Sequence, residues 1–230
     1  MTVAEASTAR LGVCAMAGVN LGPFSSYQSK YIGGAAGQLY DFARTSSVVS
    51  RDYSAALHAA LAAGVRVLYT GSIDDQLVSL ESAIFSTAHH PYISRAVYVD
   101  GRIHAPDFLA HLIGLALKLR NLGMSDHGLI RELSSSLAGS LYSGDGHARI
   151  YQDQSVYDLA VRHALETTDL RVNPVLRMDE YETPATNANP YVLPWALRGL
   201  LEEEYVKREL RMRLRNCCSS LTDGNLRTRC

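Results

Sequence analysis

Three short apolar runs, each followed by a segment of helical periodicity, constrain the fold of this chain more than any other feature. The runs cover residues 10–22, 65–71 and 93–101, and glycine or polar residues bound them. Continuous apolar runs of this length are typical of strands covered on both faces, so we expect the first to be an interior strand. Because strand and helix alternate, the sequence predicts an α/β fold with a mainly parallel sheet and crossover helices.

Apolar spacing, polar caps and glycine stops predict the helices of this fold. They cover residues 50–63, 77–88, 106–123, 125–137 and 155–168. In a parallel sheet the carboxyl ends of all strands lie at one edge, where functional sites are built. The residues that follow each strand are therefore the first candidates for a site.

The composition is that of a globular protein with a sizeable core. The chain has 230 residues, a formal net charge of −1 and 47% hydrophobic residues. It has no basic stripe, which argues against nucleic acid as a partner, and no apolar run of the roughly 20 residues that a membrane span needs. The first ten residues lack a secretory pattern, so we expect a cytoplasmic location. Its four cysteines have no zinc-site spacing, and we expect neither a metal nor another cofactor.

Two adjacent aspartates, Asp74 and Asp75, follow the second strand in "RVLYTGSIDDQLVS". A turn needs only one carboxylate, so the pair suggests a second role. A carboxylate just after a buried strand of a parallel sheet lies at the functional edge and is held nearly rigid. The alternative is that both aspartates only cap the helix expected from about Leu77.

These motifs resemble the C-terminal half of the α/β-hydrolase superfamily: a strand running into "GSIDDQLVS", a later strand "RAVYVDG", and a "GDGH" loop before the last long helix. That resemblance implies a triad acid after a late strand and a triad histidine in a following loop, and the order of residues here agrees. More narrowly, the chain resembles uncharacterised fungal α/β-hydrolase-like proteins over about residues 10–210. The stretches that carry this resemblance are "GSIDDQLVSLESAIFS", "HPYISRAVYVDGRIHAPDF", "LALKLRNLGMSDHGLIRELSSSLAGSLYSGDGHARIY" and "NPYVLPWALRGLLEEEYVK".

No G-x-S-x-G motif occurs in the 230 residues. The resemblance places residue 10 near the strand after the nucleophile-bearing helix, so we expect a partial fold that lacks the N-terminal strands and the nucleophile elbow. It implies a serine hydrolase of the esterase or lipase type in complete form, acting on a small ester or lipid-like substrate, and a chain that is inactive alone. The alternative function is a non-catalytic α/β interaction module. The sheet edge left open should make the isolated chain poorly soluble.

The resemblance implies one acid and one histidine from two candidates each. Between the two aspartates we favour Asp75. The preference is slight, because counting the family's acid motif from Gly71 selects Asp74 instead. His147 in "SGDGHARIY" has flanking glycines that let an imidazole project into a cleft, whereas His104 in "DGRIHAPDF" directly follows a strand. Both histidines stay open. The remaining histidines are expected at the surface or on helices: His58, His89, His90, His111, His127 and His163.

The resemblance also implies a lid over about residues 22–48. Its Phe24, Tyr27 and Tyr31 would form an apolar wall for an acyl group, although packing against the next helix would explain the same residues. We expect the hydrolase-like domain to cover residues 10–168. An extended segment and a charged helix should follow over 169–215, with a solvated face or a partner-binding face, and residues 216–230 should be a disordered tail.

Overall fold

The structure is a computed structural model, and it describes residues 11–24, 35–100, 108–137, 146–165, 174–181, 198–199 and 201–208. Its strands are β1 (Gly12–Met16), β2 (Arg66–Ser72), β3 (Ala88–His89), β4 (Ile93–Tyr98) and β5 (Arg177–Met178). Its helices are α1 (Val48–Ala62), α2 (Leu80–Ala83), α3 (Phe108–Asn121), α4 (Leu129–Leu137), α5 (Gly146–Arg149) and α6 (Gln154–Ala164), with a 3₁₀ helix over Ala35–Ala43. No helix among the described residues is long and apolar enough to cross a membrane.

A parallel sheet in the order β1-β2-β4 forms the centre of the molecule. Its register pairs Leu68 of β2 with Cys14 of β1 and with Ser94 of β4. All seven residues of β2 are buried, as expected for a central strand flanked on both sides. The parallel sheet and its crossover helices confirm the fold class predicted from the alternating pattern.

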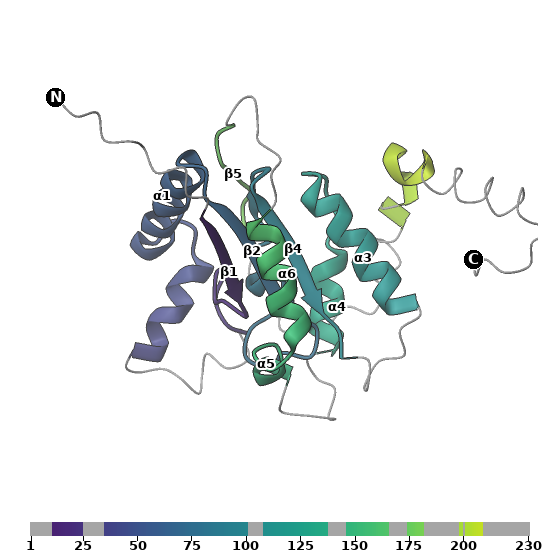
Figure 1. The fold of residues 1–230 in the computed structure, drawn as a ribbon, viewed down its shortest axis with the longest axis horizontal. Coiled ribbons are helices and arrows are strands. Elements are labelled where there is room, and N and C mark those ends of the chain that lie inside the picture. The colour runs from purple at the N-terminus through teal and green to yellow at the C-terminus, as the bar shows by residue number, and fades with distance from the viewer. Residues whose placement is uncertain are drawn as a thin grey trace, which may run out of the picture.

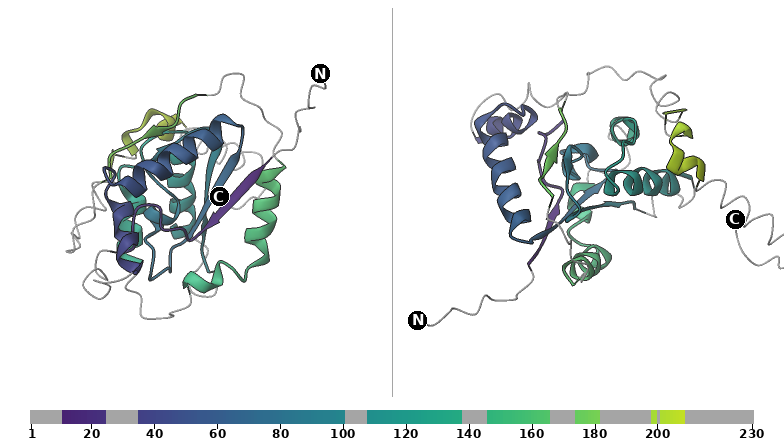
Figure 2. Two further views of the ribbon diagram at one scale, coloured as in Figure 1. Left: turned by 90° about the vertical axis from the view of Figure 1, so that its left-hand side faces the viewer. Right: turned by 90° about the horizontal axis from the view of Figure 1, so that it is seen from above.

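Helices cover both faces of this sheet. Helix α6 lies across one face, and α1, α3 and α4 lie on the other (Figures 1 and 2). Alternate residues of a strand point to opposite faces, so Val67 and Tyr69 join the larger core beneath α1 and α3. Met16 and Tyr98 pack on the other face against Ile150.

The ends of several elements differ from the sequence expectation. Strand β1 is much shorter than residues 10–22, since Ala17 takes a positive φ of 48° and ends it. It was expected to be an interior strand, but it lies at one edge of the described sheet and Val13 is 44% exposed. The helix expected over 77–88 is confined to α2, because Ser79 caps its start and Phe85 takes a φ of 43° just beyond its end.

The two edges of the sheet differ. At the β4 edge, the side-chain amide of Asn121 pairs with the backbone of Arg95: Arg95 N donates to Asn121 Oδ1 at 3.0 Å, and Asn121 Nδ2 donates to Arg95 O at 3.4 Å. This contact satisfies both backbone groups much as a neighbouring strand would. At the β1 edge, no strand pairs with the outer side of β1 among the residues that the structure describes.

His89 and His90 were expected at the surface or on a helix, and that prediction was wrong. Both are buried, and His89 belongs to β3, which pairs antiparallel with β5. His89 Nε2 lies 2.7 Å from Asp179 Oδ2. Burial lowers the pKa of His89 below its ordinary value of 6.5, and this effect outweighs the opposing contact with Asp179.

We predict that Gly71→Ala destabilises the protein by about 1–3 kcal/mol through overpacking. A Cβ on Gly71 would lie 2.8 Å from both Ala83 Cβ and Leu80 Cδ1, where α2 packs directly on β2. Gly114→Ala in α3 is the matched control, because a Cβ there meets no atom within 4 Å. Alanine should stabilise that helix by about 0.5–1 kcal/mol. Denaturant unfolding measures both changes, and equal effects would contradict the close packing.

His89 should make stability depend on pH. Its pKa is lower in the folded than in the unfolded chain, so the unfolded state binds more protons below the ordinary value of 6.5. Its contribution is therefore complete above pH 6.5 and declines as the pH falls toward the folded-state pKa. We expect the free energy of unfolding of His89→Gln to fall less steeply below pH 6.5 than that of the wild type. His58→Gln, at an exposed site on α1, should keep the wild-type slope.

Candidate active site

The turn after β2 holds a buried carboxylate. The side chain of Asp75 has no exposed surface. Its Oδ1 accepts the backbone N–H of Leu77 at 2.8 Å and that of Val78 at 2.9 Å. These two bonds fix the turn and hold the carboxylate in one orientation, which is the capping role considered for the aspartate pair.

The other carboxylate oxygen of Asp75 contacts His147. Asp75 Oδ2 lies 2.7 Å from His147 Nδ1. An ionised carboxylate only accepts hydrogen bonds, so this contact assigns the proton to Nδ1 and leaves Nε2 with an open lone pair. The imidazole is 29% exposed, and no group among the described residues hydrogen-bonds to Nε2. This arrangement can accept a proton from the solvent side and stabilise the imidazolium that results.

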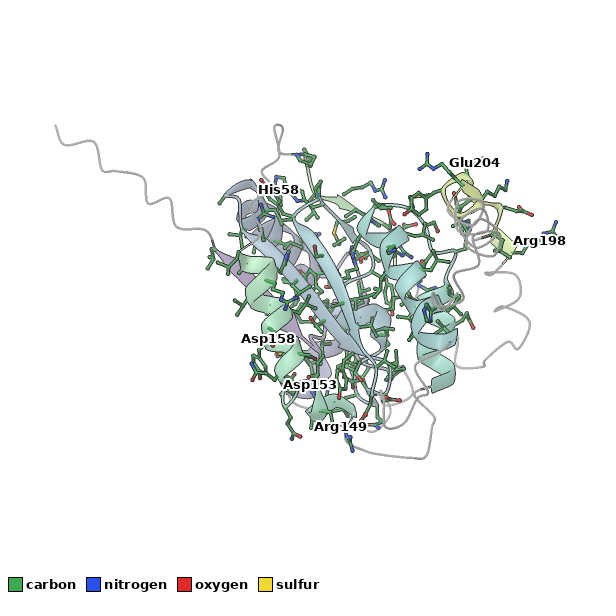
Figure 3. All side chains as sticks on the ribbon, turned by 45° about the vertical axis from the view of Figure 1, so that its right-hand side comes forward. His58, Arg149, Asp153, Asp158, Arg198 and Glu204 are labelled. Atoms are coloured by element: carbon green, nitrogen blue, oxygen red, sulfur yellow. The ribbon has the colours of Figure 1, made fainter. Side chains whose placement is uncertain are left out.

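Helix α5 carries His147 at the end of the sheet to which β1 points (Figure 1). Four residues are too few for an isolated helix to be stable, so α5 depends on its contacts. Gly146 lies so close to the turn after β2 that a Cβ there would clash with the carbonyl oxygen of Asp74. Arg149 Nη1 donates to Asp100 Oδ2 at 2.5 Å, and Ile150 is fully buried. Arg149 and Asp153 lie at this end of the molecule, whereas His58 lies near the other (Figure 3).

Tyr151 packs against the imidazole. The rings of His147 and Tyr151 are 5.7 Å apart at their centroids and inclined by 66°. Tyr151 Oη donates to the carbonyl of Met16 at the end of β1, at 3.1 Å. Burial, and then the negative charge of Asp75, raise the pKa of Tyr151. The sequence analysis missed this residue, and its only local signal was an aromatic four positions after the histidine.

Of the candidate acids and histidines, the structure brings Asp75 and His147 together. Asp74 is also buried, but its backbone N–H donates to Ser72 Oγ at 3.2 Å and its carbonyl oxygen contacts Gly146. The backbone of Asp74 thus lies against α5, the helix that carries His147. His104 lies outside the described residues.

One of the expected lid residues reaches the turn of Asp75. Phe24 N donates to Leu77 O at 3.3 Å, and Leu77 keeps 47% of its surface exposed. Sequence analysis missed Leu77, although an apolar residue two positions after the candidate acid was a visible signal. Tyr27 and Tyr31 lie outside the described residues. Nearby, Phe42 packs edge-on against Tyr53 of α1 at 5.9 Å, which is the helix packing considered as the alternative for the lid.

Neither the Cys14 thiol nor a metal-binding cluster in the described part of the chain supplies a further catalytic group beside this pair. Burial raises the pKa of the Cys14 thiol in β1, and its Sγ lies 3.8 Å from Thr70 Oγ1 of β2. A thiol with a raised pKa is a poor nucleophile. In the described part of the chain, no group of three or more His, Cys, Asp or Glu residues could hold a metal ion.

We predict that Gly146→Ala separates His147 from Asp75. The added methyl would clash with the Asp74 carbonyl, and since backbone cannot yield as a side-chain tip can, α5 must shift. NMR of ¹⁵N-labelled histidine should show loss of the hydrogen-bonded Nδ1–H signal. Ala148→Ser, at an exposed position of the same helix, should retain it. An unchanged signal in Gly146→Ala would contradict this account of how α5 is held.

Comparison with known proteins gave one family. A model described as the YMC0/YMC35 alpha/beta hydrolase domain matches residues 1–204. No curated protein and no solved structure matched the chain.

Proposed function

This chain belongs to the YMC0/YMC35 alpha/beta hydrolase domain family, and we propose that it carries the acid and the histidine of a serine-type carboxylic ester hydrolase. The contact between Asp75 Oδ2 and His147 Nδ1 at 2.7 Å is the observation that supports this proposal most strongly. A buried carboxylate, anchored by two backbone N–H groups and paired with a partly exposed imidazole, is suited to general base catalysis.

In the proposed reaction, His147 Nε2 accepts the proton of a serine hydroxyl while the serine oxygen attacks the ester carbonyl. Asp75 stays ionised and stabilises the imidazolium through Nδ1–H. When the tetrahedral adduct collapses, the imidazolium returns the proton to the departing alcohol and an acyl-serine remains. Water then attacks the acyl group with the same assistance, releasing the carboxylic acid and restoring the serine.

The serine itself is proposed to come from polypeptide outside this sequence. No G-x-S-x-G motif occurs in the 230 residues. The outer edge of β1 supports this view, since Val13 there is 44% exposed. An apolar edge strand with open backbone groups is suited to receive another strand. The chain alone should therefore be inactive.

Apolar residues on the outer side of α6 extend the same surface. Tyr157, Val161 and Leu165 follow one another at four-residue spacing and are 41%, 58% and 70% exposed. Gly12 of β1 lies directly against Ala164, so α6 and the β1 edge form one continuous region. We propose that the missing strands and their helix cover it.

The substrate proposed for this site is an ester with an apolar acyl group. Leu77 and Phe24 are joined by a backbone hydrogen bond beside the turn of Asp75, and Leu77 is half exposed. We propose that the acyl chain lies against Leu77, whose backbone N–H is bound by Asp75 of the acid–histidine pair. We propose that Tyr27 and Tyr31, which lie outside the described residues, extend this wall.

A non-catalytic interaction module remains the second candidate, through the exposed apolar residues of β1 and α6. The C-terminal segment is a weaker interaction surface, because it already packs on the chain: Val206 is buried, and His127 Nε2 lies 2.7 Å from Glu203 Oε1. Arg198 and Glu204 point outward from this segment (Figure 3).

A fluorophosphonate probe tests the proposal. The isolated chain should not be labelled, because the probe reacts only with an activated serine. Translation of the genomic sequence upstream should reveal an apolar strand followed by G-x-S-x-G. Co-expression of that segment should restore labelling and ester hydrolysis.

In the restored enzyme, Asp75→Asn should lower kcat roughly 10⁴-fold, since the histidine tautomer is then no longer fixed. Asp52→Asn, at an exposed position of α1, is the matched control and should retain full activity. Strong labelling of the isolated chain would overturn the proposal of an external serine. An unambiguous stop codon and promoter upstream would favour the interaction module.

A further inference from the structure

The imidazole of His147 is held on two sides. On one side Asp75 Oδ2 fixes Nδ1, and on the other the ring of Tyr151 lies at a centroid distance of 5.7 Å. A single hydrogen bond to Nδ1 allows the imidazole to swing about that bond. A ring packed at 66° to the imidazole plane limits this motion.

Tyr151 is itself anchored at both ends. Its hydroxyl donates to Met16 O at 3.1 Å, and its backbone carbonyl accepts the hydroxyl of Tyr157 at 2.8 Å. The residue before it, Ile150, is fully buried. Movement of the ring would break its hydroxyl contact with the end of β1, while the contact with Tyr157 of α6 holds the backbone of Tyr151.

We infer that Tyr151 is a positioning residue for His147, whose ring keeps Nδ1 on Asp75 and Nε2 turned to the open side. The inference deepens the proposed function and rests on it. Because the hydroxyl is bound to the end of β1, Tyr151 also ties the position of the imidazole to the strand that would adjoin the serine-bearing segment.

The test is NMR of the 230-residue chain with ¹⁵N-labelled histidine, with His147 assigned by the signal lost in His147→Gln. The wild type should show His147 as the Nδ1–H tautomer, with slow exchange of that proton. Tyr151→Leu should lower the population of the paired form relative to the unpaired form by about two- to tenfold, the range expected for loss of one aromatic contact. Exchange with water should accelerate by the same factor.

Tyr151→Phe should rescue most of this effect, because it keeps the ring and loses only the bond to Met16. Tyr92→Leu is the matched control, since Tyr92 lies 5.5 Å from the ring of a different histidine, His90. It should leave the His147 signals unchanged. If Tyr151→Leu fails to fold, Tyr151→Met provides similar volume without a ring and should give the same loss.

Wild-type signals in a folded Tyr151→Leu or Tyr151→Met variant would overturn the inference. Asp75→Asn separates this outcome from a failure of the proposed function. If Asp75→Asn removes the Nδ1–H signal while the Tyr151 variants keep it, only the positioning role is wrong. If Asp75→Asn keeps the signal, the acid–histidine pair itself is wrong.

Discussion

The carboxylate of Asp75 connects the fold to the candidate active site, because its two oxygens bind different parts of the chain. Oδ1 accepts two backbone N–H groups of its own turn, and Oδ2 holds His147, which lies 72 residues further along the chain. Burying an ionised group is costly unless hydrogen bonds compensate for lost hydration, and three N–H donors do so here. The two adjacent aspartates are therefore placed differently. The carboxylate of Asp75 contacts His147, and the backbone carbonyl of Asp74 lies close to Gly146 at the start of α5.

This pair depends on the central position of β2. A fully buried strand cannot shift without opening the core on both faces, so the turn that follows it is a rigid place for a carboxylate. His147 reaches this carboxylate on the four-residue helix α5. The close packing of Gly146, the buried Ile150 and the ion pair of Arg149 with Asp100 hold that helix in place. The site thus combines a rigid turn after β2 with a short helix, α5, which is held rigid only by its tertiary contacts.

The sequence predicted this fold where local pattern decides structure. The apolar runs identified β1, β2 and β4, since alternation of strand and helix leaves few topologies other than a parallel sheet. The preference for Asp75 over Asp74 was slight, because the pattern does not fix the register of the turn. The bond from Ile73 N to Tyr98 O extends the strand pairing by one residue and thereby sets that register.

Features that depend on distant contacts were not predictable. The contact of Tyr151 with Met16 joins residues 135 positions apart, and no local periodicity reports it. His89 was misplaced because a two-residue strand has no pattern of its own, and its burial depends on pairing with β5. The early end of β1 follows from the backbone conformation of Ala17, an alanine that gives no turn signal of its own.

Asn121 makes the two edges of the sheet unequal as places where a further strand could pair. Its amide pairs with the backbone of Arg95 in β4, whereas among the described residues no strand pairs with the outer side of β1. The backbone N–H and carbonyl of Arg95 already have partners, so an incoming strand would gain fewer hydrogen bonds along β4 than along β1. Pairing with a further strand is therefore favoured at the β1 edge.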